Sequence, residues 1–295
     1  MHNSYFRVGG VSVEVSGGQC ADTALAYPLH PFRVEPEIPD IQVQIERTSG
    51  FSREPDHPLF DSGSVWKLYQ RDEDFQFDFS APSMGVNPYK RLIVDPEFHS
   101  ARLLVDERHF TSRPESAAPL DYPLDELLIM HRLTQEKAIE LHGCGIVRAD
   151  GIGNLFVGHS GAGKSTTTRL WITHEDAEIL SDDRIIVRRE ARDDCSRMRM
   201  YGTPWHGEAM YASPGSAPLA RIFVLEHGYG NVLTRLSPSQ AVAELFARSF
   251  VPFHRHEYVD SALQFLQEVV DGIPVYRYAF EPDQRAVDKI LNLHD

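Results

Sequence analysis

Residues 158–167 read "GHSGAGKSTT" and place two glycines, a lysine and a serine in the spacing G-x-x-x-x-G-K-S. This spacing is typical of a loop that holds the phosphates of a nucleotide. Glycine lets backbone N–H groups converge without a Cβ atom in the way, and a helix that starts there adds free amides and the positive end of its dipole. The stretch follows an apolar run, 154–157, and precedes a segment compatible with a helix, as the motif requires.

The loop therefore predicts a site for a nucleoside triphosphate with magnesium, that is, ATP and Mg²⁺ as cofactors. Lys164 can reach the β- and γ-phosphates, and the hydroxyl of Ser165 can ligate Mg²⁺. The alternative is a glycine turn that binds nothing, which the surrounding pattern disfavours. The residues predicted to bind the nucleotide are Gly158, His159, Ser160, Gly161, Ala162, Gly163, Lys164, Ser165 and Thr166.

The segments around the loop predict an α/β fold with a mixed β-sheet. "LHGCGIV" (141–147) and "NLFVG" (154–158) flank a glycine-containing turn, so a β-hairpin leads directly into the loop. Downstream, "EILSDDRIIVRRE" (178–190) reads as a strand, an acidic pair and a second strand. We further predict strands at 220–228 and 273–280, and helices at 237–250, 257–272 and 283–293.

Residues 1–112 predict a β-rich accessory domain, which we expect to be an antiparallel sheet. The runs 11–15, 41–45 and 75–79 alternate apolar and polar residues, the period of a half-buried strand. "RLIVD" (91–95) and "ARLLVDE" (101–107) predict a hairpin. A docking surface for a protein substrate is the alternative role of this domain.

The polar, proline-containing residues 113–123 are typical of a linker. A second domain, 124–295, is then predicted to open with a helix that places four apolar side chains near one face. These side chains are Leu124, Leu127, Leu128 and Met130.

The composition excludes several classes of protein. The chain has 295 residues, 42% of them hydrophobic, and a formal net charge of −14, which disfavours nucleic acid and anionic membranes as partners. Three scattered cysteines predict neither a disulfide framework nor a structural zinc site. The start has no signal pattern, and no apolar run approaches the roughly 18 residues of a membrane span. We therefore expect a soluble, cytoplasmic protein.

Asp182 and Asp183 form an acidic pair at the end of a predicted strand. Neighbouring residues of an extended chain point in opposite directions, so one carboxylate can approach magnesium while the other faces the hydroxyl of an acceptor. A solvated turn between two strands is the alternative, and the upstream phosphate loop favours catalysis. A charge-stabilising arginine is also expected, for which Arg184, Arg221 and Arg248 are candidates.

Three stretches together resemble the HPr serine kinase family: "LHG" at 141–143, "GIGNLFVGHSGAGKST" at 151–166 and "LSDDR" at 180–184. The resemblance implies the phosphate-loop fold that this family shares with phosphoenolpyruvate carboxykinases. It also implies that Asp183 is the general base, Asp182 its partner near the metal and His142 an active-site histidine. Glu208, in "GTPWHGEAM", matches the second magnesium ligand by its distance along the chain, and Trp205 and His206 are either walls of the acceptor pocket or a turn around a buried tryptophan.

By this resemblance, the function expected is transfer of the γ-phosphoryl group of ATP to a serine or threonine hydroxyl of a protein or peptide. Two alternatives stay open: a small-molecule phosphotransferase of the carboxykinase type, and a nucleotide-binding regulator without transferase activity. Lys164, Asp183, His142 and Asp182 are the catalytic candidates, and Ser165, Asp182 and Glu208 are the metal candidates. A homo-oligomer is a further possibility, since HPr kinases are hexamers.

Overall fold

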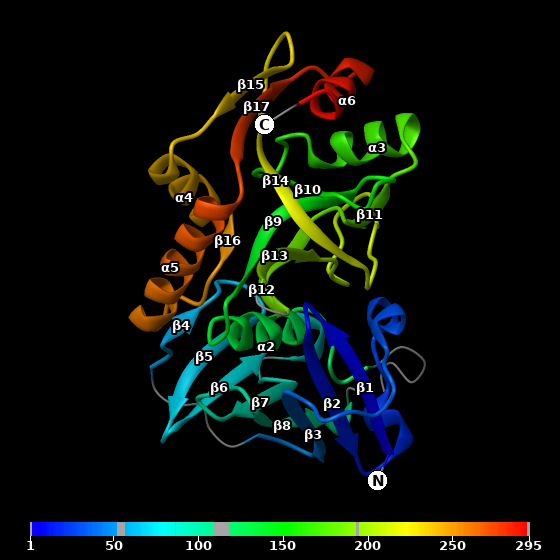
Figure 1. Cartoon of the computed structure of the whole chain (residues 1–295). Coiled ribbons are helices and arrows are strands. Elements are labelled where there is room, and N and C mark those ends of the chain that lie inside the picture. The colour runs from blue at the N-terminus through cyan, green and yellow to red at the C-terminus, as the bar shows by residue number, and fades with distance from the viewer. Residues whose placement is uncertain (1, 52–56, 86, 109–117, 193–194, 294–295) are drawn as a thin grey trace. The chain divides into compact units, whose positions relative to one another are not determined.

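The computed structural model describes residues 2–51, 57–85, 87–108, 118–192 and 195–293. Over these residues the chain divides into two compact units (Figure 1). Unit 1 comprises Met1–Arg7 and Val11–Arg132, and unit 2 comprises Val8–Gly10 and Leu133–Asp295. Each unit is built on a mixed β-sheet with few helices. None of the helices in these ranges has the length and apolar composition that a membrane crossing needs.

Unit 1 contains an eight-stranded sheet in the order β1-β2-β3-β8-β7-β6-β5-β4. Every strand and hairpin predicted here is present, and β7 and β8 pair antiparallel. The expected all-antiparallel sheet is wrong, however, because β2 pairs parallel with β3 and β3 pairs parallel with β8. The long connection between β2 and β3, and the four strands that separate β3 from β8 along the chain, allow these parallel pairs. The strands are β1 (His2–Val8), β2 (Val11–Gly17), β3 (Ile41–Thr48), β4 (Phe60–Asp61), β5 (Trp66–Arg71), β6 (Asp74–Phe79), β7 (Lys90–Val94) and β8 (Ser100–Asp106).

The helix α2 (Leu124–Leu133) belongs to unit 1 almost entirely, because the division falls after Arg132. The ring of its buried His131 stacks on Phe98, with ring centroids 4.6 Å apart, and meets the edge of Phe77. The domain boundary predicted from the sequence lies before Leu124, ahead of this helix. Of the linker predicted at 113–123, residues 113–117 lie outside the described residues.

Unit 2 confirms the predicted mixed sheet. Its main strand order is β10-β9-β12-β13-β14-β17-β15, and the predicted hairpin is the antiparallel pair β9–β10. The other edge of β10 pairs parallel with β14, so both edges of the strand before the glycine-rich loop 158–163 are hydrogen-bonded. The strands are β9 (Ala138–Val147), β10 (Gly153–Val157), β11 (Glu178–Ser181), β12 (Arg184–Arg192), β13 (Cys195–Tyr201), β14 (Ser216–His227), β15 (Val232–Arg235), β16 (Ser249–Phe250) and β17 (Val275–Phe280).

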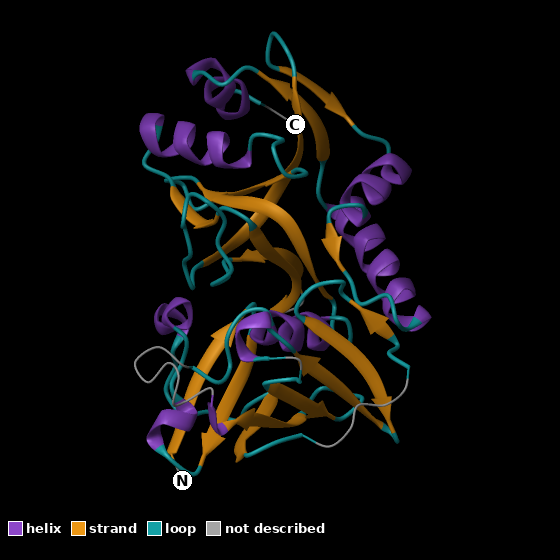
Figure 2. Cartoon of the chain, turned by 180° about the vertical axis from the view of Figure 1, so that it is seen from behind, coloured by secondary structure: helices purple, strands orange, loops and turns teal. Residues whose placement is uncertain are grey.

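Helices cover both faces of this sheet, which explains the unbroken apolar runs 155–157 of β10 and 222–225 of β14. Leu155 and Val157 face one core together with α4 and α5, and Phe156 faces the opposite core with α3 and α6. Figures 1 and 2 show these two helix pairs on opposite sides of the strands. The helices are α3 (Lys164–His174), α4 (Pro238–Phe246), α5 (His256–Gly272) and α6 (Gln284–Leu291).

Candidate functional site

The loop between β10 and α3 has the geometry that its glycines predict. Gly161 and Gly163 have φ values of 80° and 104°, in the left-handed region that favours glycine. A Cβ atom on Gly163 would also lie 2.7 Å from Cζ of Phe280, which is buried below the loop. Position 163 therefore requires glycine for two separate reasons, its backbone conformation and its contact with β17.

Replacement of Gly163 by alanine is expected to lower the free energy of unfolding more than replacement of Gly161. Both substitutions force a Cβ onto a left-handed residue, which lowers the free energy of unfolding by about 1 kcal/mol each. Only the Cβ at position 163 overlaps the ring of Phe280, and this overlap lowers the free energy by about another 1–3 kcal/mol. A Cβ at 161 would meet no atom within 4 Å, so Gly161→Ala is the matched control. Urea unfolding of both variants measures the difference, and equal losses would contradict the contact with Phe280.

Lys164 starts α3 and bends back over the loop. Its buried Nζ donates to the carbonyl oxygens of Gly158 at 3.0 Å and His159 at 3.3 Å. Burial lowers the pKa of Lys164, and the negative charge of Asp183 opposes that shift. The ammonium group thus lies within electrostatic range of the predicted base. His159 and Ser160, also in the loop, are exposed, and Ser165 and Thr166 are half-buried.

Three neighbouring strands bring the loop, His142 and the acidic pair together. The N–H of Gly158 donates to the carbonyl oxygen of His142 at 3.2 Å, directly before the loop. On the other edge of β9, His142 is paired with Arg184, and the N–H of Gly143 donates to the carbonyl oxygen of Asp183 at 3.0 Å. These residues are therefore held in place by the register of the sheet.

The carboxylate of Asp183 is held by two side chains. Nε2 of His142 lies 3.0 Å from Oδ1, and a guanidinium N–H of Arg184 donates to Oδ2. Burial alone would raise the pKa of Asp183, but the hydrogen bond from His142 and the charges of Arg184 and Lys164 together lower it. An ionised carboxylate only accepts hydrogen bonds, so Nε2 of His142 is the donor.

Arg184 is the one of the three candidate arginines that contacts Asp183. Its guanidinium also lies over the ring of Phe250, 4.0 Å from the centroid, and its Nε is 3.5 Å from buried Glu140. Arg221 instead donates to the carbonyl oxygen of Leu293. Arg248 pairs with Glu244, and only its backbone reaches the site, by accepting from the N–H of His142 at 2.7 Å.

Asp182 points into the protein and fixes a loop. Its buried Oδ1 accepts from the N–H groups of Gly207 at 3.0 Å and Tyr211 at 3.2 Å, and Oδ2 accepts from Ala209 at 2.8 Å. The two aspartates lie in a bend between β11 and β12 and not in the extended chain expected from the sequence, and their carboxylates contact different partners. The predicted metal role of Asp182 stays a prediction, and the contacts give this carboxylate a second role in holding residues 207–211.

Glu208 lies in that loop and is exposed. Trp205, predicted as a wall of the acceptor pocket, is only 6% exposed and therefore belongs to the interior. His206, the other predicted wall, is half-buried, and its Nδ1 lies 3.1 Å from the carbonyl oxygen of Gly207. No three His, Cys, Asp or Glu side chains gather into a metal cluster within the described ranges. The magnesium ligands Ser165, Asp182 and Glu208 remain predictions.

Two residues at the loop were not predicted. Nε2 of His227 lies 2.7 Å from the carbonyl oxygen of Gly161, and Phe280 packs below Gly163. They are paired with each other across β14 and β17. His227 and Phe280 lie at the ends of two predicted strands. Their proximity to the loop, however, depends on the parallel pairing of β10, β14 and β17, which sequence patterns did not reveal.

Cys144 lies on β9 below α3, with its Sγ 3.7 Å from the carbonyl oxygen of Lys164. Burial raises the pKa of this thiol to about 12. At neutral pH the thiol is therefore protonated, and a protonated thiol is a poor nucleophile. Its place under the loop indicates a packing role.

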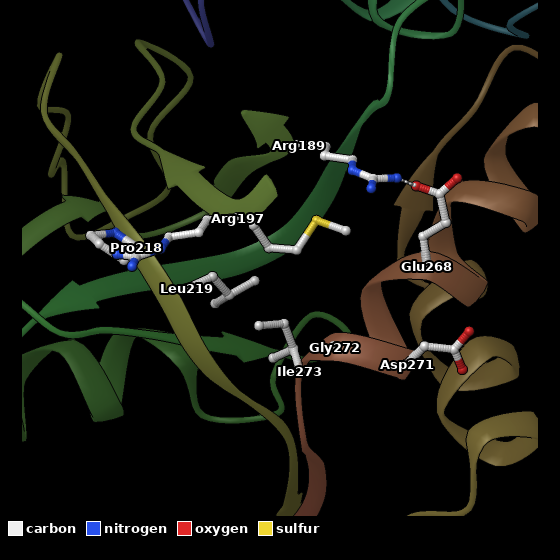
Figure 3. Close-up of a pocket in the computed structure, with 9 residues that line it drawn as sticks. Arg189, Arg197, Pro218, Leu219, Glu268, Asp271, Gly272 and Ile273 are labelled. Carbon is white, nitrogen blue, oxygen red and sulfur yellow. Dashed lines mark hydrogen bonds and ion pairs between the residues drawn. The ribbon is translucent and has the colours of Figure 1, made fainter. Parts of the chain in front are cut away.

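A cavity of about 490 Å³ lies away from these residues (Figure 3). It is near Leu219, which pairs with Gly153 at the start of β10, whereas the phosphate loop follows the end of that strand. In Figure 3, Arg189 points toward Glu268 of α5, with which it forms an ion pair of 2.6 Å. The cavity is therefore separate from the candidate site.

Comparisons with known proteins identify no family. No family model matches the chain, and no curated protein matches it. Among solved structures, the chain is similar to the HPr(Ser) kinase/phosphatase from Coxiella burnetii, with 9% identity and a TM-score of 0.28 over 51% of this chain and 90% of that one. A likeness at that score supports no conclusion, so the resemblance to HPr kinases rests on the motifs quoted above.

Proposed function

We propose that this chain is an ATP- and Mg²⁺-dependent kinase that transfers the γ-phosphoryl group to a serine or threonine hydroxyl of a protein or peptide. The observation that carries the proposal is the carboxylate of Asp183, held by His142 and within electrostatic range of Lys164. A phosphate loop beside a positioned carboxylate is the arrangement that phosphoryl transfer to a hydroxyl needs.

In this proposal the loop and Lys164 hold the polyphosphate. The N–H groups around Gly161 and Gly163 and the positive end of α3 favour the negative charge of the phosphates. Lys164 turns from the carbonyl groups of Gly158 and His159 to the β- and γ-phosphates. Magnesium would neutralise charge on the phosphate oxygens. The oxygen donors of Ser165 and Glu208 suit Mg²⁺, which takes few protein ligands beside phosphate and water.

Asp183 accepts the proton of the acceptor hydroxyl. The hydroxyl oxygen forms a bond to the γ-phosphorus, the bond from that phosphorus to the bridging oxygen breaks, and ADP leaves with the electron pair. His142 and Arg184 orient the carboxylate but also make it a weaker base by lowering its pKa. The loose transition state of phosphoryl transfer makes a small demand on the nucleophile, so a weak base is sufficient.

A transfer assay tests the proposal. Purified protein is incubated with ATP labelled on the γ-phosphate, Mg²⁺ and peptides that carry one serine, with the serine-to-alanine peptides as controls. We expect label on the serine peptides and none on the alanine peptides, and ATP hydrolysis without peptide gives the background. ATP binding with every serine peptide unlabelled would contradict a kinase and favour the nucleotide-binding regulator.

A further inference from the structure

The segment Gly207–Tyr211, here called the acceptor loop, lies directly against the acidic pair. A Cβ atom built on Gly207 would be 3.1 Å from Cβ of Asp183 and 3.0 Å from Oδ2 of Asp182. Both distances are shorter than most real Cβ contacts, so glycine favours this approach. The backbone of the loop thus borders the carboxylate that we propose as the base.

Asp182 holds the acceptor loop through three of its backbone amides. A further hydrogen bond, from the N–H of Met210 to the carbonyl oxygen of Gly207 at 3.2 Å, closes a turn. The carboxylate of Asp182 is buried, and both of its oxygens accept from this one short segment. Asp182 therefore ties the position of the loop to that of the adjacent Asp183.

Met210 combines an unusual backbone conformation with an exposed apolar side chain. Its φ is 60°, in the left-handed region that side chains other than glycine, asparagine and aspartate rarely occupy. Its apolar side chain is also 71% exposed. The neighbouring Tyr211 is 37% exposed. Backbone strain and an exposed large apolar group at one position, beside a chemically active group, are typical of a binding surface.

We propose that the acceptor loop selects the substrate by contact between Met210 and an apolar side chain next to the phosphorylated serine or threonine. This inference rests on the proposed kinase function and names the class of acceptor that the same site takes. The flexible thioether of methionine adapts to apolar side chains of different shape. Exposed Glu208 and the net charge of −14 disfavour acidic residues in the same place.

The openness of the acceptor loop favours a peptide over a small metabolite. Sites for small molecules are concave and bury most of the surface of their ligand. Here Met210 and Glu208 are both exposed. An extended segment of another chain can lie across such a surface and place its hydroxyl beside Asp183.

The test compares two variants on two peptides. The peptides share one serine and differ only next to it, where one carries leucine and the other glutamate. Met210→Asn removes the apolar contact but keeps the left-handed backbone, because asparagine tolerates that conformation. Leu263→Ala, which shortens an exposed apolar side chain of α5, is the matched control. The measured quantities are kcat/KM for each peptide and Kd for ATP.

We expect the wild-type protein and Leu263→Ala to prefer the leucine peptide by about tenfold or more. Met210→Asn should reduce that preference to about twofold or less while the Kd for ATP stays unchanged. A wild-type protein without preference, or a preference that Met210→Asn retains, overturns the role of the loop but leaves the kinase standing. Failure of the wild-type protein to label either peptide overturns both proposals.

Discussion

Replacement of Asp183 by asparagine is expected to lower kcat by about 10²- to 10⁴-fold, the range that general-base catalysis contributes. Asparagine has nearly the same size and can still accept a hydrogen bond from His142, but it cannot take the proton of the acceptor hydroxyl. The Kd for ATP should change little, because the phosphates are held by the loop and Lys164. Single-turnover transfer from labelled ATP and an equilibrium ATP titration measure the two quantities separately.

The acid side of the pH profile gives a second readout for Asp183. Its folded-state pKa is lowered, so the carboxylate is ionised throughout the neutral range and kcat should not fall through its protonation between about pH 6 and pH 8. A lowered pKa also stabilises the fold above the unfolded-state pKa of about 3.9, and this contribution is lost as the pH falls through the folded-state pKa. In Asp183→Asn this acid-dependent part of the free energy of unfolding should be absent.

Asp288→Asn is the matched control, since this exposed aspartate lies on α6. It should leave kcat and ATP binding at wild-type values. If Asp183→Asn transfers phosphate at the wild-type rate, the assignment of the base is wrong. If it loses ATP binding and keeps its turnover, the carboxylate serves the nucleotide site instead.

Replacement of Lys164 by alanine should weaken ATP binding by about ten- to 100-fold, because charge-assisted hydrogen bonds to the phosphates are lost. The transition state would also lose a hydrogen-bond donor to the charge that develops on the phosphate oxygens. The kcat/KM for ATP should therefore fall by about 10²- to 10³-fold. Lys164 is buried and its ammonium group donates to the carbonyl oxygens of Gly158 and His159, so its removal also leaves acceptors unsatisfied. Titration with ATP and steady-state kinetics measure the two effects.

Two controls separate the role of Lys164 from a loss of fold. Lys289→Ala removes an exposed lysine of α6 and should leave both quantities unchanged. Circular dichroism of Lys164→Ala should match that of the wild-type protein, since α3 keeps its other hydrogen bonds. A folded Lys164→Ala protein that binds ATP with wild-type affinity would rule out the phosphate loop as the nucleotide site.

Much of unit 2 could be predicted from the sequence because its elements have strong local signals. The hairpin before the loop follows from two apolar runs around a glycine turn. The helix α4 begins with a capping box that can be read from the sequence, in which Ser237 and Gln240 bond each other's backbone N–H groups. The helix α5 ends at Gly272 as expected. In each case nearby residues along the chain carry the whole signal.

What the sequence missed depends on pairing between distant segments. The strand β13 is an exception, because "RMRMY" (197–201) alternates charged and apolar residues with the period of a half-buried strand, and this local signal was overlooked. The parallel pairs of β3 with β2 and β8 are set by tertiary packing. For the same reason the structural role of Asp182 was not predicted, since its three partners lie more than twenty residues downstream.

The pairing of β9 along both of its edges limits how such a protein can diverge. Insertion or deletion of one residue in β9 would turn its following side chains to the opposite face and carry His142 away from Asp183. Descendants of this sequence should therefore keep the length of that strand. The shape of the acceptor loop depends mainly on the carboxylate of Asp182. Substitutions in this loop can therefore change which substrate the proposed kinase accepts and leave its nucleotide site unchanged.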